Sequence, residues 1–304
     1  MFNSCYFSYA DCYSGKYDLI IAYVNRYESF VAGASYEPIT DVLPTIPENI
    51  LTGIDYSKNR LEFTVEIINQ NSNIPLTQLI EINDWLCGQD GWKTLKLKSP
   101  DFSKYHLKCL FVPESIIRDV TGYRGIRCKL INISSFWYGD ERVYSFEKSD
   151  MIANGNVTNF TFAVNNDSGV DLPVYPIIQC KLETSEYQED FPFWVNNYTN
   201  NSLLDMVMST DDNGVDTDSI LTSQLVTINS KYPYFYTTNP NNAILKYKPH
   251  ISSNYNSLQS GLLYLSKGKN TIQVACHTKP NNSHYRYYDK FIFKFSPRYR
   301  IGGF

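Results

Sequence analysis

SGLLYLSKGKNTIQVA, residues 260–275, joins an apolar run to a second run in which apolar and polar residues alternate, across a Ser-Lys-Gly-Lys-Asn break. A period of two places the apolar side chains on one face of a β-strand. Gly268 lies in the break, where a glycine can adopt a positive φ without steric cost. The stretch therefore predicts two strands joined by a hairpin-like structural turn at Gly268.

The Gly268-Lys269 pair also invites a phosphate-binding interpretation. A P-loop requires Gly at position 263 and Ser or Thr at position 270, and a helix must follow. The sequence has Leu263 and Asn270 at these positions, and no helical periodicity follows them. This excludes the nucleotide site, and the sequence indicates no other cofactor.

The composition extends the β prediction to the whole chain. Its 304 residues include 25 Tyr and 17 Phe, and Asn, Ser and Thr are abundant. Aromatic residues favour strands, and Asn and Ser favour turns. The length suits two domains, and the polar stretch EKSDMIANGNVTN is the best boundary. We expect a mainly β protein with domains at residues 1–150 and 151–304.

The first half combines strands with one helix. In RLEFTVEII, residues 60–68, polar and apolar residues alternate from Arg60 to Ile67, as in a half-buried strand. Residues 76–87 carry apolar side chains at spacings of three and four, with Pro75 ahead and Gly88 behind, which predicts a short amphipathic helix. Three strand-like runs follow, divided by Ser-Pro-Asp, Pro-Glu-Ser and Gly-Tyr-Arg-Gly segments.

The second half has short strand-like runs separated by Gly, Asn and Pro, which is typical of a β-sandwich or jelly roll. Its tail, HYRYYDKFIFKFSPRYR, mixes aromatic and basic residues, as a surface for single-stranded nucleic acid does. However, Phe291, Phe293 and Phe295 share one face of a strand. A core strand is the favoured interpretation.

The charge distribution limits the classes of partner. A net charge of −4 argues against a protein that neutralises many phosphates of a nucleic acid. Residues 167–218 hold 11 acidic side chains and one basic one, whereas residues 231–304 hold 11 basic side chains and one acidic one. Interleaved strands would cancel this asymmetry within one domain; otherwise it would give opposite faces suited to packing copies side by side.

Cysteine usage and the chain start indicate reduced thiols and no membrane insertion. The seven Cys form no CxxC pair, so neither a disulfide framework nor a zinc ribbon is indicated. The start MFNSCYFSYADCY has no basic and apolar signal pattern, and no run of 18 apolar residues occurs. We expect a chain that is made in the cytoplasm and is not inserted into a membrane.

Catalytic and metal patterns are weak. The acidic loop STDDNGVDTDS, residues 209–219, lacks the first and last ligands of an EF-hand, which leaves a solvated turn or an irregular Ca²⁺ site. The four His form no HExxH motif, and no GxSxG is present. Glu189-Asp190 precede the aromatic run at residues 191–194, a pattern compatible with glycoside chemistry or with saccharide binding without turnover. We expect no enzymatic activity.

The order of elements resembles the distal tail protein family of siphophages. The opening FNSCYFSYADCYSGKYDLIIAYVNRY and the helix TQLIEINDWLCG, followed by WKTLKLKSPDFSKYHLKCLF, are similar to that family's ring-forming domain. LVTINSKYPYFYT is similar to a central strand and turn of its second domain. Leu265, Gly268 and Asn270 match the family pattern of leucine, two residues, Gly, one residue and Asn. The chain departs from the family where DVLPTIPENILTGIDYSKN replaces a basic Gly-Arg segment.

The resemblance implies a two-domain architecture. The first domain would be a β-sandwich or barrel-like ring-forming domain with one short helix. The second would be a galectin-like or carbohydrate-module-like β-sandwich. The resemblance also implies a structural virion protein at the tail tip, made in the host cytoplasm, that forms a homo-oligomeric ring, a hexamer.

The same resemblance implies the partners. The ring would connect the tail tube protein to tail-tip or baseplate proteins, including a tail-associated lysin-type protein, and would contact receptor-binding proteins or a host saccharide. Trp137 and Tyr138, taken as exposed aromatics near the domain boundary, are the expected interface residues. The alternative function is a host-surface carbohydrate-binding module of a tail adhesion device, with Trp194, Tyr232 and Tyr234 as a stacking platform.

Overall fold

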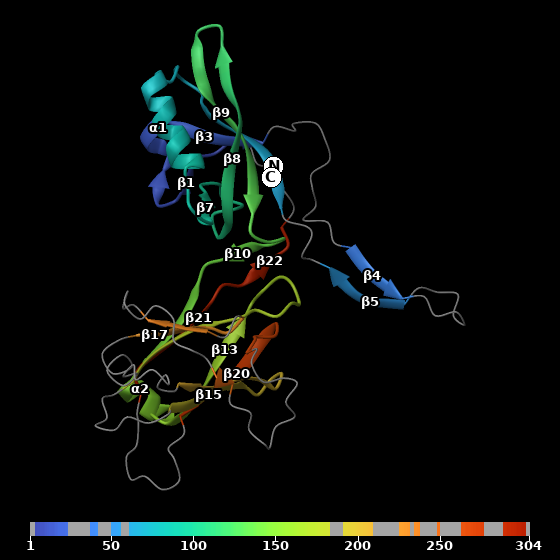
Figure 1. The fold of residues 1–304 in the computed structure, drawn as a ribbon, viewed down its shortest axis with the longest axis vertical. Coiled ribbons are helices and arrows are strands. Elements are labelled where there is room, and N and C mark those ends of the chain that lie inside the picture. Colours follow the sequence, from blue (N-terminus) through green and yellow to red (C-terminus); the bar gives the residue numbers. More distant parts are fainter. Residues whose placement is uncertain are drawn as a thin grey trace. The chain divides into compact units, whose positions relative to one another are not determined.

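The computed structural model shows two compact units (Figure 1). The first comprises residues 1–140 and 298–304, and the second comprises residues 141–297. The structure describes residues 4–23, 37–41, 50–55, 61–182, 191–208, 225–231, 234–237, 248–249, 263–276 and 288–301.

The division differs in two respects from the domains expected at residues 1–150 and 151–304. Strand β11 (Arg142–Glu147) pairs along its whole length with β21 (Tyr288–Phe295) of the second unit. The last strand, β22 (Arg298–Tyr299), pairs with β10 (Trp137–Gly139) of the first unit. Pairing between segments that are distant in sequence therefore sets the boundary, and the polar stretch that begins at residue 147 does not.

A nine-stranded sheet forms the first unit, in the order β2-β1-β7-β8-β9-β6-β3 with β10 and β22 attached at β8. The strands are β1 (Phe7–Tyr9), β2 (Cys12–Tyr13), β3 (Leu19–Tyr23), β6 (Glu62–Asn69), β7 (Lys93–Leu97), β8 (Tyr105–Asp119) and β9 (Gly122–Asn132). A 3₁₀ turn, η1 (Ser14–Tyr17), precedes β3, and β4 (Glu37–Asp41) pairs with β5 (Ile50–Asp55).

This sheet closes on itself. Cys5, just ahead of β1, donates a backbone hydrogen bond to Ile21 O at 3.2 Å and accepts one from Ile21 N at 2.9 Å. Because Ile21 belongs to β3, this bridge joins the last strand of the order to the segment ahead of β1 and makes the sheet barrel-like. Closure of this kind covers edges that would otherwise expose unpaired backbone groups.

Helix α1 (Leu76–Cys87) packs against the barrel as its periodicity predicted. Leu79, Ile82 and Leu86 are buried in the core of the first unit. Trp85 Nε1 donates to Tyr9 O at 3.0 Å. This hydrogen bond attaches the last turn of α1 to β1. The predicted helix is confirmed.

The second unit is a β-sandwich. One sheet has the order β11-β21-β14-β17-β18 and the other has the order β12-β13-β20-β15-β16-β19. The additional strands are β12 (Gly155–Asn156), β13 (Asn159–Asn166), β14 (Ile177–Leu182), β15 (Phe191–Asn197), β16 (Ser202–Met208), β17 (Val226–Asn229), β18 (Tyr234–Thr237), β19 (Lys248–Pro249) and β20 (Gly268–Cys276). A six-residue helix, α2 (Lys148–Ala153), follows β11.

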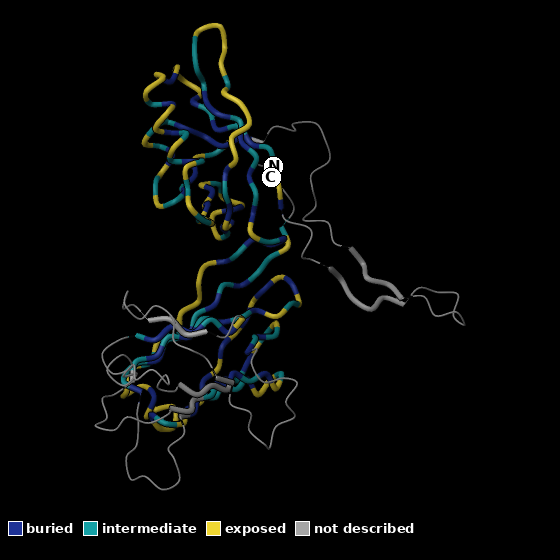
Figure 2. Tube along the Cα trace, in the orientation of Figure 1, coloured by how far each residue is buried: buried dark blue, intermediate teal, exposed yellow. Residues whose placement is uncertain are grey.

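One apolar cluster fills the space between the two sheets. Phe160, Phe162 and Ile272 from one sheet share it with Phe291 and Phe293 from the other. Buried and exposed residues alternate strictly along β13, as Figure 2 shows. The prediction of a mainly β protein is confirmed, and the aromatic tail forms a core strand as expected.

The opening stretch forms a turn, but the predicted hairpin is wrong. Gly268 has the expected positive φ, +91°. However, Leu265 pairs with Val174 through backbone hydrogen bonds of 2.8 and 3.1 Å, whereas β20 pairs with β13 and β15. The buried Asn270 side chain accepts from Ser266 N at 3.0 Å and donates to Ser266 O and Gly268 O at 2.8 Å. The turn therefore connects Leu265, which pairs with Val174, to β20, which pairs with β13 and β15.

Candidate assembly surface

The β8–β9 hairpin extends beyond the strands that flank it. β7 pairs with β8 only from His106 to Cys109, and β6 pairs with β9 only as far as Gly125. Beyond these points the two strands have only each other (Figure 1). We call residues 112–124 the hairpin arm, and most of the β8 half of it is exposed (Figure 2).

The predicted break at Pro-Glu-Ser lies within this arm and is wrong. β8 continues through it, with a register shift between Pro113 and Ser115. A bulge of this kind accommodates a proline, because its missing N–H is not needed for the ladder. The hairpin is therefore longer than the predicted break at Pro-Glu-Ser indicated.

The arm exposes apolar side chains at its surface. Val112 and Val120 are exposed, and Ile116, which lies opposite Ile126, is 54% exposed. Full burial of one such side chain contributes about 1.5–3 kcal/mol. An exposed apolar arm of this kind is typical of a surface that packs against another molecule.

A second apolar surface lies on α1. Leu76 and Ile80 are both exposed and are four residues apart, so they share one helix face. The adjacent face carries the buried Leu79 and Ile82. The helix thus adds a second group of exposed apolar side chains to the first unit.

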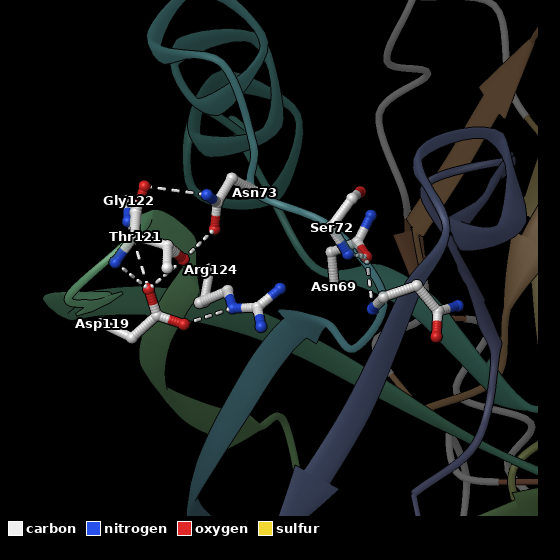
Figure 3. A network of polar contacts seen from close by, with 8 residues as sticks. Asn69, Ser72, Asn73, Asp119, Thr121, Gly122 and Arg124 are labelled. Atoms are coloured by element: carbon white, nitrogen blue, oxygen red, sulfur yellow. Dashed lines mark hydrogen bonds and ion pairs between the residues drawn. The ribbon is translucent and has the colours of Figure 1, made fainter.

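Hydrogen bonds fix the tip of the arm (Figure 3). Asp119 Oδ1 accepts from Thr121 Oγ1 at 2.6 Å, from Thr121 N at 2.7 Å and from Gly122 N at 3.1 Å. Asp119 Oδ2 accepts from Arg124 Nε at 2.7 Å. These hydrogen bonds hold the pKa of the Asp119 carboxyl well below its usual range, and those from Thr121 have the largest effect. The tip is ordered by its own side chains.

The tip is also attached to the segment before α1. Asn73 Nδ2 donates to Thr121 O at 2.8 Å, and Thr121 Oγ1 lies 3.0 Å from Asn73 Oδ1. Ile74 N donates to Tyr123 O at 2.8 Å. The arm and the start of the helix are therefore held together as one element.

The outer face of the barrel carries ion pairs between neighbouring strands. Lys129 Nζ lies 2.5 Å from Glu62 Oε2, and Arg127 Nη2 lies 2.6 Å from Glu66 Oε1. Exposed pairs such as these contribute about 0–1 kcal/mol each. These pairs therefore add little to the stability of the barrel.

Of the two residues expected at the interface, Trp137 is not exposed. It is fully buried in the core of the first unit, and its ring lies 5.2 Å from that of Phe102. Its strand is covered because β22 returns to pair with it, so the prediction of an exposed Trp137 is wrong. Tyr138 is half-buried and donates to Ser134 Oγ at 2.8 Å. Its interface role stays a prediction.

The residues expected to bind saccharide do not form one platform. Trp194 is half-buried on β15 of the six-stranded sheet, whereas Tyr234 begins β18 of the five-stranded sheet. Tyr232 lies outside the described residues, as do the acidic loop 209–219 and Glu189-Asp190. Trp194 alone therefore stays a candidate for stacking on a saccharide, without Tyr232 and Tyr234.

No metal site is found in the described part of the chain, where no three His, Cys, Asp or Glu side chains come together. Burial, reinforced by Lys108 and Lys96, lowers the pKa of His106 to about 4, so its imidazole is neutral at neutral pH. The cysteines at positions 5, 12, 87, 109, 128 and 180 are free thiols. Among the described helices, none is long and apolar enough to span a membrane.

The comparisons with known proteins agree with this architecture. Residues 2–134 match the family model described as phage tail protein N-terminal domain. A search of curated proteins by sequence finds no significant match.

Two solved structures share the fold over nearly the whole chain. The Dit protein of phage SPP1, described as a paradigm of the hub adsorption apparatus in phages that infect Gram-positive bacteria, is 10% identical with a TM-score of 0.52, covering 96% of this chain and 98% of its own. A chain of the phage P2 baseplate in its activated conformation with Ca is 7% identical with a TM-score of 0.50, covering 97% and 98%. Residues 2–134 thus match the model of a phage tail protein N-terminal domain, and the whole chain shares its fold with these two solved structures.

Proposed function

We propose that the protein is a structural hub at the tip of a phage tail, whose first unit assembles into a ring of identical subunits, a hexamer. The observation that carries this proposal is the hairpin arm, an ordered projection with exposed apolar side chains such as Ile116. The family match of residues 2–134 and the shared hub fold support it.

The arm supplies one half of a head-to-tail contact. In a ring, one surface of each subunit packs against a different surface of the next, and the ring closes when the rotation between subunits closes. The arm, together with the Leu76–Ile80 face of the helix attached to it, is one such surface. Because the Asp119 hydrogen bonds already order the tip, assembly loses less conformational entropy than it would with a free loop.

The proposed partners follow from this position in the tail. The ring lies between the tail tube protein and tail-tip proteins, including one of the tail-associated lysin type, and the second unit is the attachment point for receptor-binding proteins. The hub acts through geometry and burial, not through chemical catalysis, and the fold shared with a hub protein and with a chain of a baseplate supports the analogy.

The test is the assembly state of Ile116→Asp. Ile116 is 54% exposed, and a matched control is Val143→Asp, whose native side chain is 53% exposed on β11 of the second unit. Both variants add the same charge at an exposed apolar position. Native mass should show rings in the control and single subunits in Ile116→Asp, with equal thermal midpoints. Rings of Ile116→Asp as abundant as those of the control would refute the arm as an interface.

A further inference from the structure

Two cysteine thiols of the first unit lie next to each other in its core. Cys87 is the last residue of α1, and Cys128 belongs to β9. Although the two residues are far apart in the sequence, their thiols are joined by a hydrogen bond. Cys128 is part of the apolar cluster that fills the barrel, and Cys87 packs against this cluster. Both are free thiols, so the pair is a dithiol in its reduced state.

The two thiols come together because α1 lies along β9. Ahead of the helix, Ile74 N donates to Tyr123 O of β9 at 2.8 Å, and α1 itself packs against β9. The 12 residues of α1 span about 18 Å. The strand from Tyr123 to Cys128 spans about 17 Å. The two elements therefore cover the same distance, and Cys87 is brought to Cys128.

The two thiols differ in their access to solvent. Cys128 is fully buried, whereas Cys87 is half-buried and is followed by the exposed Gly88. A small oxidant in solution therefore reaches Cys87 before it reaches Cys128.

The hydrogen bond also makes Cys87 the more reactive thiol. Donation from the Cys128 thiol lowers the pKa of Cys87 and outweighs the opposing effect of burial. The same hydrogen bond, together with burial, raises the pKa of Cys128, so Cys128 keeps its proton. The thiolate is the nucleophilic form of cysteine. Cys87 is therefore the attacking thiol, and Cys128 is the thiol that can react with its oxidised product.

Cys109, the other fully buried thiol of the first unit, is not placed to compete. It lies on β8, four residues from Pro113, which is the residue opposite Cys128. Four strand positions correspond to about 13 Å, whereas the Cα atoms of a disulfide lie about 4.4–6.8 Å apart. Burial also raises the pKa of Cys109. Cys128 is therefore within reach of Cys87 and out of reach of Cys109.

We propose that Cys87 and Cys128 form a peroxide-reactive dithiol that closes to a disulfide and stabilises the first unit. The Cys87 thiolate attacks one oxygen of hydrogen peroxide, and the O–O bond breaks. Cys87 becomes a sulfenic acid, and the hydroxide that leaves takes a proton from solvent to form water. The Cys128 sulfur then attacks the Cys87 sulfur, the S–O bond breaks, and the hydroxyl leaves with the Cys128 proton as a second water. Two thiols are thus oxidised and one peroxide is reduced.

The disulfide would attach α1 to β9 at both ends of the helix. The start is already held by the hydrogen bond from Ile74 to Tyr123, and the new bond would hold the last residue. A cross-link between residues that are distant in the sequence stabilises a fold by restricting the unfolded chain. This proposal depends on the interior of the barrel and is independent of the ring.

The experiment treats the reduced full-length chain with hydrogen peroxide and maps its peptides by mass spectrometry without reductant. We expect a peptide pair joined at Cys87 and Cys128, lighter by two hydrogen atoms and separated again by dithiothreitol. Cys87→Ser should abolish this pair. The matched control Cys12→Ser, which removes another half-buried thiol of the first unit, should keep it.

Thermal unfolding measures the effect on stability. Oxidation should raise the thermal midpoint of the first unit by about 5 °C or more in the wild type and in Cys12→Ser, and it should leave the midpoint of Cys87→Ser unchanged. In Cys128→Ala, Cys87 should stop at the sulfenic acid, which dimedone traps. Unfolding of each variant before oxidation shows that it is folded.

Four results would overturn the proposal. Cys87 could be oxidised to a sulfinic or sulfonic acid while Cys128 stays a free thiol, or it could be linked to a different cysteine. It could stay reduced at a peroxide concentration that oxidises Cys12. Finally, the Cys87–Cys128 disulfide could form without raising the thermal midpoint.

Discussion

Arg124 Nε donates to Asp119 Oδ2 at 2.7 Å, across the tip of a hairpin that no other described strand flanks there. The other oxygen of the same carboxylate accepts from Thr121 and Gly122. One side chain thus orders the tip of the hairpin arm, and this order underlies the proposed assembly.

Replacing Asp119 with alanine should reduce ring formation without unfolding the barrel. The substitution removes the acceptor of four hydrogen bonds at the tip, while the core residues of the first unit are untouched. Native mass should show fewer rings at a given concentration, with a thermal midpoint close to that of the wild type. Asp90→Ala, which removes an exposed aspartate paired with Lys93, is the matched control. Equal ring yield in both variants would contradict the role of the tip.

The order of the tip should also persist into mildly acidic solution. Hydrogen bonds from Thr121 hold the pKa of Asp119 below its usual range. A carboxyl group whose pKa is lowered by folding contributes stability that is complete above its unfolded pKa of about 3.9 and is lost as the pH falls through the folded pKa.

Hydrogen exchange of the Thr121 and Gly122 amides measures this dependence. After correction for intrinsic rates, protection at about pH 5 should equal that at about pH 7, because both lie above the unfolded pKa. Protection should decline only in strongly acidic solution. A loss of protection between these two pH values would show that the carboxylate does not hold the tip.

Gly125 should tolerate no side chain. A Cβ at this position would lie 2.0 Å from Ile67 O, where β9 passes close to β6. We expect Gly125→Ala to lower the free energy of unfolding of the first unit by about 1–3 kcal/mol, since the strands must move apart. Gly91→Ala is the control, because a Cβ there would meet nothing within 4 Å. Denaturant unfolding of the two variants tests the difference, and equal midpoints would be inconsistent with the close approach.

Substitutions at Gly268 should be limited by the backbone conformation of this residue and not by contacts with neighbouring atoms. A Cβ would meet nothing within 4 Å, but φ is +91°. Gly268→Val should therefore destabilise the second unit by about 1 kcal/mol or more, and Gly268→Asn should cost less because Asn tolerates positive φ better. Calorimetric unfolding distinguishes the two. Titration with ATP should be flat for the wild type, and tight binding that depends on Lys269 would reverse the interpretation of this turn.

Local sequence patterns predicted the elements whose stability is local. The recurrence of Leu76, Leu79, Ile80, Asn83 and Leu86 at spacings of three and four, between Pro75 and Gly88, was sufficient to predict α1. Its buried face consists of Leu79, Ile82 and Leu86, whereas Leu76 and Ile80 are exposed. The alternation of Phe291, Phe293 and Phe295 was sufficient to predict a core strand, because this face of the strand is buried.

Long-range pairing was the part that the sequence could not indicate. Leu265 pairs with Val174, which is distant in the chain, so local alternation could not reveal the partner. Trp137 lies in a polar surrounding in the sequence and is buried because Tyr299 of β22 pairs beside it. Pro113 was expected to end a strand, but the strand continues through it because the register shifts at a bulge between Pro113 and Ser115.

The same limits applied to the candidate surfaces and to the thiol pair. The sequence of the arm shows apolar residues at 112, 116 and 120, but their exposure depends on the flanking strands ending earlier. Cys87 and Cys128 carried no signal as a pair, since their thiols come together only when α1 packs against β9. Trp194 was a candidate because it follows other aromatic residues, and it lies half-buried on β15.

The most direct test of the central claim is the native mass of the purified chain together with negative-stain images. A closed ring of identical subunits predicts a single mass at an integral multiple of 35.1 kDa, six for the proposed hexamer, and annular particles. A monomer at high concentration, with no annular particles in the images, would contradict the account.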